Sequence, residues 1–236
     1  MLTGGKSLPG IVASHTCTTY QHSTEIQPFF IPHCMQITLT DTGKRFNREW
    51  IFRHCSFRFE PGMRYAITGP NGSGKSTLLQ VIAGATMQSE GKIEYSLNNG
   101  LVENPYQHIA IAAPYLELIE EMTAMEFLRF HETFKKFSLP LNQVLEACSL
   151  AKASGKQIRY FSSGMKQRLK LAQAFFCNTP VLLLDEPLTN LDKQGAELYL
   201  QLTAEYGKNR LVIISSNDPA EYVNCDEIIS IADFKN

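Results

Sequence analysis

Short segments of alternating hydrophobic and polar residues dominate the chain from Met35 to about residue 112. The segment 35–40 (MQITLT) alternates as a half-buried strand does. Glycine, proline and asparagine turns separate four further strand-like segments, at 51–59, 65–68, 92–97 and 108–112. One helix is expected at 75–85, beginning inside a glycine-rich segment and ending near Gly84. We therefore predict that this part of the chain is mainly β-structure.

The pattern becomes helical between about 114 and 178. Hydrophobic side chains recur there at helical spacing, at Met122, Met125 and Leu128, at Leu141, Val144, Leu145 and Cys148, and at Met165, Leu169, Ala172 and Phe176. After a turn at 178–180, the chain alternates between a strand at 181–184, a helix at 191–206 and a strand at 211–215. This order predicts an α/β fold, with a parallel sheet and a helical insert at about 114–178.

The first 34 residues differ from the rest. They are rich in Thr, Ser, His, Gly and Pro and show neither helical nor strand periodicity. We expect a disordered or loosely docked arm at 1–34 and a folded domain at 35–236, with Met35 as one candidate for the natural start. The amino end also lacks the charged start and apolar segment of a secretory signal, which predicts a cytosolic chain.

Composition narrows the classes of function. The chain has 236 residues, of which 44% are hydrophobic, enough for a sizeable core. Lys and Arg together number 22 against 23 Asp and Glu, so the basic excess of a nucleic-acid-binding protein is missing. The apolar runs are far shorter than the roughly 20 residues needed to cross a bilayer. Any membrane role is therefore expected to act through a partner.

A glycine-rich loop carries the strongest chemical signal. It follows the apolar segment 65–68, precedes a predicted helix, and fits the pattern G-x-x-x-x-G-K-[ST]. The loop consists of Gly69, Pro70, Asn71, Gly72, Ser73, Gly74, Lys75, Ser76 and Thr77. Glycines let backbone N–H groups approach phosphate oxygens, and the helix start adds its positive dipole end. Lys75 is expected to reach the β and γ phosphates and Ser76 to ligate Mg²⁺. ATP is the predicted ligand.

Two adjacent acids follow the apolar segment 181–184. An Asp at the carboxyl end of a parallel strand beside a phosphate loop can hold the Mg²⁺ shell, which is the role expected of Asp185. The neighbouring Glu186 is expected to polarise the attacking water as a catalytic base. Alone, such a pair more often marks a solvated strand end. Together with the phosphate loop, it predicts a site for phosphoryl transfer to water.

The segment 161–168 (FSSGMKQR), shortly before this acidic pair, resembles the signature motif of the ATP-binding cassette (ABC) family. The family's L-S-G-G-Q corresponds here to Phe161, Ser162, Ser163, Gly164 and Met165, so Ser162 and Gly164 match. The segment 188–192 (LTNLD) is similar to the family's D-loop, which ends here at Asp192, and Phe46 falls where an aromatic residue usually stacks on adenine. An ordinary serine-capped helix start and a surface or core aromatic are the alternatives for Ser162 and Phe46.

The resemblance implies an ABC ATPase fold, in which a P-loop NTPase core carries an antiparallel β-subdomain and an α-helical subdomain. In this family two cassettes meet head to tail. Ser162, Ser163 and Gly164 of one chain would then cap the γ-phosphate bound to the other chain, in a homodimer or a paired cassette. The resemblance further implies that the chain hydrolyses Mg-ATP and so drives a separate transmembrane permease subunit. The chain would then lie on the cytoplasmic face of the membrane.

Two positions depart from the family pattern. Pro114 stands closest to the place of a strand-end Gln, and Asn217 stands where the family has a His after the last core strand. Asn217 can still hydrogen-bond to a γ-phosphate but cannot carry a proton as imidazole does. We therefore expect slow turnover, with Glu186, Lys75 and Asn217 as the catalytic group. The alternatives are a regulatory ATP-binding module with weak or no hydrolysis, and a soluble cassette protein of the DNA-repair or translation kind.

Overall fold

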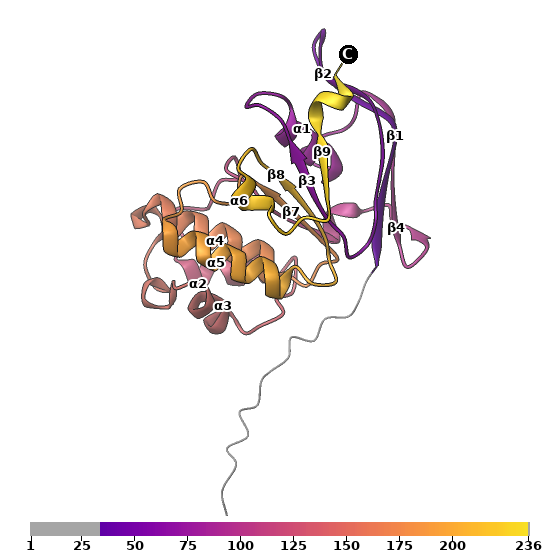
Figure 1. Cartoon of the computed structure of the whole chain (residues 1–236). Helices are drawn as coiled ribbons and strands as arrows, with labels where there is room; N and C mark the ends of the chain where they lie inside the picture. The colour runs from indigo at the N-terminus through magenta and orange to yellow at the C-terminus, as the bar shows by residue number, and fades with distance from the viewer. Residues whose placement is uncertain (1–33, 236) are drawn as a thin grey trace, which may run out of the picture.

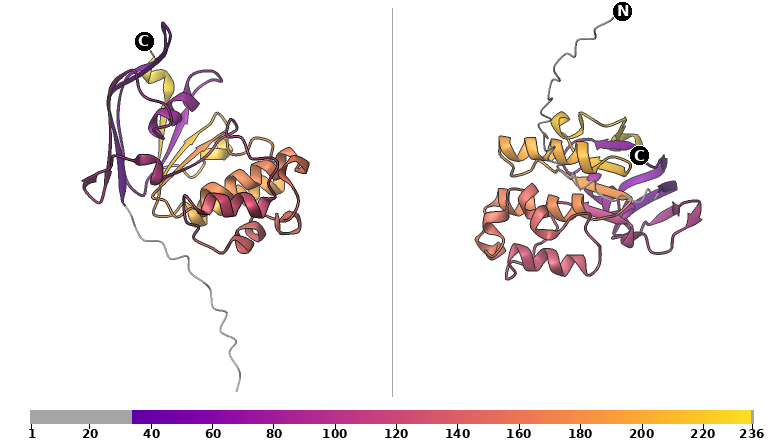
Figure 2. Two further views of the ribbon diagram at one scale, coloured as in Figure 1. Left: turned by 180° about the vertical axis from the view of Figure 1, so that it is seen from behind. Right: turned by 90° about the horizontal axis from the view of Figure 1, so that it is seen from below.

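The computed structural model describes residues 34–235, so the predicted arm lies outside the described residues apart from Cys34. Two sheets and a group of helices form three layers (Figure 1). Seen from below, most of the helices lie on one side of the central parallel sheet and the antiparallel sheet lies on the other, with the first helix packed between the two sheets (Figure 2). The fold is that of an α/β P-loop NTPase core with an antiparallel β-subdomain and a helical subdomain.

The antiparallel sheet has the strand order β2-β1-β4-β5. Its members are β1 (Met35–Phe46), β2 (Glu49–Phe59), β4 (Glu90–Leu97) and β5 (Gly100–Leu101). Strand β1 continues six residues beyond the predicted end at 40. Alternation cannot be followed past that point because the register between β1 and β2 shifts between Leu39 and Thr42, where Asp41 adopts a φ of 48°.

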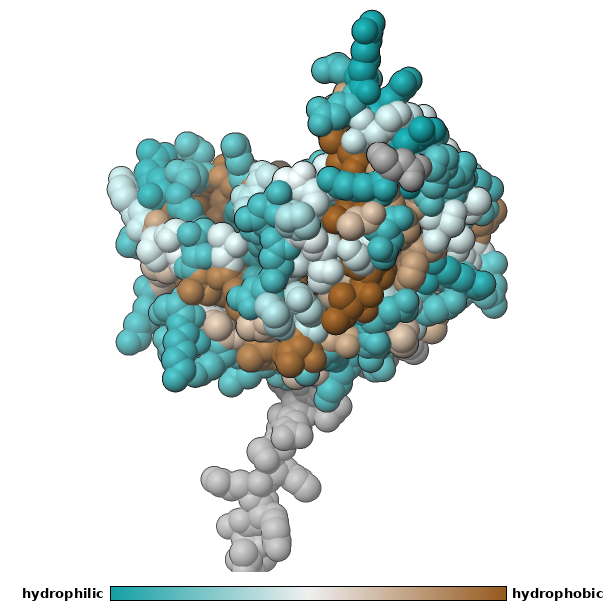
Figure 3. Space-filling model, turned by 45° about the horizontal axis from the view of Figure 1, so that its top comes forward, coloured by the Kyte–Doolittle hydropathy of each residue, from teal (hydrophilic) through white to brown (hydrophobic). Residues whose placement is uncertain are grey.

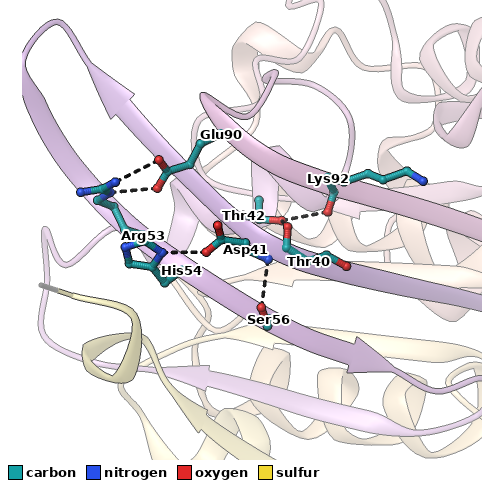
Figure 4. Close-up of polar contacts among 8 residues, drawn as sticks. All are labelled: Thr40, Asp41, Thr42, Arg53, His54, Ser56, Glu90 and Lys92. Atoms are coloured by element: carbon teal, nitrogen blue, oxygen red, sulfur yellow. Dashed lines mark hydrogen bonds and ion pairs between the residues drawn. The ribbon is translucent and has the colours of Figure 1, made fainter.

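Polar contacts hold this bulge in place (Figure 4). The Asp41 amide donates to Ser56 Oγ at 2.9 Å, and the Asp41 carboxylate pairs with His54 Nδ1 at 2.6 Å. Arg53 donates two hydrogen bonds to the Glu90 carboxylate, at 2.8 and 3.1 Å, which ties β2 to β4 across β1. A bulge bends its strand and increases the local twist. The bent end of the sheet carries the β1–β2 hairpin, whose residue Ile51 reaches the phosphate loop.

The central sheet is parallel, with the strand order β6-β7-β8-β3-β9. Its members are β3 (Arg64–Thr68), β6 (Ile109–Ala112), β7 (Val181–Asp185), β8 (Leu211–Ser215) and β9 (Glu227–Ser230). On β7, Val181 and Leu183 enter the core below the antiparallel sheet, whereas Leu182 and Leu184 enter the core below the helices. Both faces of the sheet are thus covered, which explains the continuous apolar runs.

The helices form the third layer, except for the first helix, which packs between the two sheets. They are α1 (Lys75–Ile82), α2 (Ala124–Glu132), α3 (Leu141–Ala147), α4 (Ser163–Phe176), α5 (Lys193–Tyr206) and α6 (Pro219–Tyr222). Short 3₁₀ turns occur at Pro105–Gln107, Ala151–Ala153, Ile158–Tyr160 and Ile231–Phe234. Helix α1 ends three residues before the predicted 85, because Gly84 takes a left-handed φ of 70° just after its C-cap. Helices α2, α3 and α4 occupy the segment predicted as the helical insert.

The face shown in Figure 3 is mostly hydrophilic, with hydrophobic side chains in separate patches. In the part of the chain that the structure describes, none of the helices has the length and apolar character needed to span a bilayer.

Candidate nucleotide-binding site

The glycine-rich loop joins the end of β3 to the start of α1. Gly69, Gly72 and Gly74 have φ angles of 143°, 74° and 103°, which side chains other than glycine rarely adopt. Gly74 caps α1, and a Cβ on it would overlap with Cγ2 of Ile51 on β2. Glycine is therefore required at position 74 both for backbone conformation and for the close approach of β2.

Lys75 is the first residue of α1 and is only 4% exposed. Its Nζ donates hydrogen bonds to the carbonyl oxygens of Gly69 at 2.7 Å and Pro70 at 3.2 Å. A cavity of about 210 Å³ opens beside it. The lining comes from Ile51, Asn71, Gly72, Ser73, Gly74, Lys75, Ser76, Thr77 and Glu186. An ammonium group and a helix start facing one cavity make a binding place for an anion.

The acidic pair ends strand β7. Asp185 is 1% exposed, and its Oδ1 has no hydrogen-bond partner among the described residues. A buried carboxylate oxygen without a partner is costly unless a cation or donor fills the place. Such an oxygen at the end of β7 fits a Mg²⁺ ion, which prefers oxygen ligands. Glu186 follows with a φ of 44° and lines the cavity that contains Lys75.

Tyr115 is a neighbour of this acidic pair that sequence reasoning missed. Partial burial of the residue, which is 41% exposed, and then the Asp185 charge raise the pKa of Tyr115 to about 12. The phenol is therefore protonated at neutral pH and can donate a hydrogen bond. It directly follows Pro114, the residue predicted at the place of the family's Gln. An aromatic hydroxyl that responds to the Asp185 charge thus follows the position at which the sequence departs from the family's Gln.

The turn from Glu186 to Asp192 is held by side chains of α4 and by the cap of α5. Gln167 of α4 donates from Nε2 to the Pro187 carbonyl at 2.9 Å, inside the core. Asp192 caps α5 by accepting from the Gly195 amide at 2.8 Å, and it pairs with Arg168 of α4 at 3.0 Å. These two contacts lower the pKa of Asp192. The turn is therefore attached to the helix that begins at the candidate signature motif.

Ser162 caps that helix, since its Oγ accepts from the Met165 amide at 3.2 Å. A Cβ on Gly164 would lie 3.1 Å from the Asn190 carbonyl oxygen, so a small residue suits the place. Ser163 lines a separate cavity of about 470 Å³ together with Pro114, Lys166 and Lys170. Ser162 and Ser163 of the motif are exposed, and none of the described residues that line the cavity at Lys75 comes from the motif. The phosphate loop and the candidate signature motif thus line separate cavities of this chain.

Asn217 follows β8 and lies at the phosphate loop. Its Nδ2 donates to Asn71 Oδ1 at 2.6 Å. Both residues line a further cavity of about 290 Å³, which also contains Glu186. The structure therefore brings Asn217 to the same end of the site as Glu186 and the loop.

Phe46 ends strand β1 and is 49% exposed, with the Lys44 ammonium 4.9 Å from its ring centre. Neighbouring strand pairs alternate faces, so Phe46 with Glu49 and Arg45 with Trp50 lie on opposite faces of the hairpin. Phe46 belongs to the same hairpin as Ile51, and it is Ile51 that approaches the phosphate loop. Its predicted stacking role stays a prediction.

Known proteins with similar sequences contain ATP-binding cassettes. Residues 52–189, more than half of the chain, match the sequence profile of the family described as ABC transporter. The chain is 33% identical over 200 residues to the uncharacterized ABC transporter ATP-binding protein YxlF of Bacillus subtilis, covering 82% of this chain and 66% of that protein. It is 30% identical over 205 residues to the cytochrome c biogenesis ATP-binding export protein CcmA of Rhizobium etli, covering 82% and 94%.

Among solved structures, a dimeric ATP-binding cassette in a post-hydrolysis state with ADP and phosphate superposes with a TM-score of 0.71 at 23% identity. The match covers 82% of this chain and 93% of that one. This likeness concerns the fold. Together, the profile match, the sequence relatives and the glycine-rich loop show that the chain belongs to the ABC transporter family and is one of its ATP-binding cassettes.

Proposed function

We propose that the chain binds Mg-ATP at the loop Gly69–Thr77 and hydrolyses it as the ATPase subunit of a transporter. The observation that carries this proposal is the buried Lys75, which shares one cavity with Ser76 and Glu186. In such a cavity the lysine and the backbone N–H groups bind the phosphates. The carboxylate stands ready to accept a proton from the attacking water.

Ser76 and Asp185 would hold Mg²⁺, and the unpartnered Oδ1 of Asp185 supports this assignment. When bound, the ion neutralises charge on the phosphate oxygens. Glu186 acts on the attacking water, and Asn217 donates its amide N–H to the γ-phosphate from its position beside Asn71. Phe46 is the proposed platform for the adenine ring.

We propose a head-to-tail pair of chains as the working unit. None of the described residues that line the cavity at Lys75 comes from the signature motif. Within that motif, Ser162, Ser163 and Gly164 are exposed or half-buried at the start of α4. A helix start is suited to bind phosphate oxygens. In the pair, this helix start of one chain faces the nucleotide of the other, and Asp192 holds the D-loop between them. The dimeric cassette with ADP and phosphate supports this arrangement by its likeness of fold.

We further propose that a separate membrane subunit docks near the cavity of about 470 Å³. Its lining contains Glu117, an ion pair between Glu120 and Lys166, and Lys170, which donates to the Pro114 carbonyl. A basic segment of a partner would find the Glu117 carboxylate there. This partner would hold the chain on the cytoplasmic face of the membrane; among the relatives, CcmA is named as an ATP-binding export protein.

Phosphate release by the purified chain, with Lys75→Ala as the comparison, tests the proposal. We expect Mg-ATP hydrolysis by the parent, and neither ATP binding by calorimetry nor hydrolysis in the variant, because the phosphates lose their closest cation. Unchanged ATP affinity in Lys75→Ala would refute the assignment of the loop. ATP binding without phosphate release by the parent would favour the alternative, a regulatory module, to which the changes at Pro114 and Asn217 point.

A further inference from the structure

Glu221 is a buried acid that sequence reasoning did not identify. It lies on the short helix α6 and is 6% exposed. Its Oε1 accepts a hydrogen bond from the Leu188 amide at 2.7 Å, whereas Oε2 has no hydrogen-bond partner among the described residues. Burial raises the pKa of this carboxyl. The Ser216 hydroxyl is near enough to oppose the rise, but it is not in hydrogen-bonding geometry with Oε2.

The unpartnered oxygen belongs to a side chain that lines the cavity of about 290 Å³ described above. Glu186, Asn71 and Asn217 line the same cavity. A polar cavity of this size has room for several water molecules. Oε2 itself is buried beneath this lining, and an unsatisfied buried carboxylate oxygen is costly, so this acceptor calls for a water molecule at the inner wall of the cavity.

The other oxygen holds the turn that carries Glu186. This residue has a positive φ of 44°, a conformation that costs free energy for a residue with a side chain. The surrounding structure must therefore hold it in place. Its own amide donates to the Ser215 carbonyl at 2.9 Å, and Glu221 binds the amide of Leu188, two residues further on. Tyr199 of α5 in turn fixes Glu221, since its hydroxyl donates to the Glu221 carbonyl oxygen at 2.6 Å.

We propose that Glu221 is a positioning residue for ATP hydrolysis. One carboxylate oxygen fixes the Leu188 amide and thereby the direction of the Glu186 side chain. The other accepts a hydrogen bond from water in the cavity that Glu186 and Asn217 share, and so orders the water next to the proposed base. This inference rests on the proposed ATPase function, but its first half concerns the folded chain alone.

Two variants of the full chain separate the roles of the two oxygens. Glu221→Gln keeps an oxygen for the Leu188 amide and replaces Oε2 by a donor. We expect kcat for ATP to fall about tenfold or more, with KM within about twofold of the parent, because binding is kept while the attacking water is misplaced. Hydrogen exchange of the Leu188 amide should not change. Glu221→Ala removes both oxygens, so exchange at Leu188 should also become about tenfold faster or more.

Glu205→Gln, the same change on the exposed side of α5, is the matched control and should leave kcat and exchange as in the parent. A kcat of Glu221→Gln within about twofold of the parent would overturn the role of Oε2. Unchanged Leu188 exchange in Glu221→Ala would overturn the hold on the turn. If the parent released no phosphate, the proposed function would fail and so would the role of Oε2, whereas the exchange result would still decide the hold on the turn.

Discussion

Replacing Gly74 by alanine tests how closely strand β2 packs on the phosphate loop. Gly74 has a φ of 103°, and an added Cβ would overlap with Cγ2 of Ile51. Ile51 is branched at Cβ, so it has few rotamers into which it can move away. Backbone strain and steric overlap therefore both oppose this substitution.

Gly72 provides the matched comparison, because its φ is 74° but an added Cβ would meet nothing within 4 Å. Gly72→Ala should thus lower the free energy of unfolding by backbone strain alone, about 1–2 kcal/mol. Gly74→Ala adds the cost of overpacking, about 1–3 kcal/mol. We expect Gly74→Ala to lose about 2–5 kcal/mol in all, and ATP affinity to fall with it.

Urea unfolding followed by circular dichroism measures both losses. Combining Gly74→Ala with Ile51→Ala, which removes Cγ2, should recover most of the overpacking cost, whereas Ile51→Val keeps Cγ2 and should not. Equal losses in Gly72→Ala and Gly74→Ala, or equal recovery by the two Ile51 variants, would refute the close approach of β2 to the loop.

Three further results are expected. Ser162→Arg should lose cooperative turnover, and a mixture with Lys75→Ala should regain at most one composite site per mixed dimer; full turnover of Ser162→Arg alone would end the head-to-tail arrangement. Asn217→His should raise phosphate release when Glu186 is present but not in Glu186→Gln, since imidazole adds a group that can carry a proton. If the parent already releases phosphate rapidly and the variant releases it at the same rate, Asn217 does not limit catalysis. Thr123→Ala should lower the free energy of unfolding by about 1 kcal/mol without changing ATP affinity, because the Thr123 hydroxyl accepts from the Glu126 amide at 3.2 Å as the cap of α2; an affinity loss in calorimetry would contradict this separation.

The sequence pattern predicted those strands, turns and helices that depend on residues close together in the chain. The apolar runs at β7 and β8 and the glycine-rich loop before α1 are contiguous in sequence, so their spacing alone indicates strand, turn and helix. The extension of β1 past residue 40 was not predictable, because contacts with Ser56 and with β4 stabilise the bulge at Asp41. The early end of α1 reflects the left-handed conformation of Gly84, which a helical pattern does not show.

In the candidate site, too, residues within short motifs could be predicted and contacts between distant residues could not. Lys75, Ser76 and the acidic pair were predicted from short motifs, and their roles stay predictions. The bond from Asn217 to Asn71 joins residues 146 positions apart, and spacing gives no sign of it. Glu221 was missed because its partner Leu188 lies 33 positions earlier and a single Glu in a short helix carries no pattern. Tyr115 was missed because a single Tyr after a strand carries no pattern, and Asp185, whose charge acts on it, lies far along the sequence.

The central claim is that two chains enclose ATP between the phosphate loop of one and the signature helix of the other. The most direct test is size-exclusion chromatography with light scattering of Glu186→Gln, which keeps the shape of the side chain but cannot act as a base. The variant should run as a monomer without nucleotide and as a dimer with Mg-ATP, because trapped ligand stabilises the pair by mass action. A monomer under both conditions, with ATP binding intact by calorimetry, would contradict the claim.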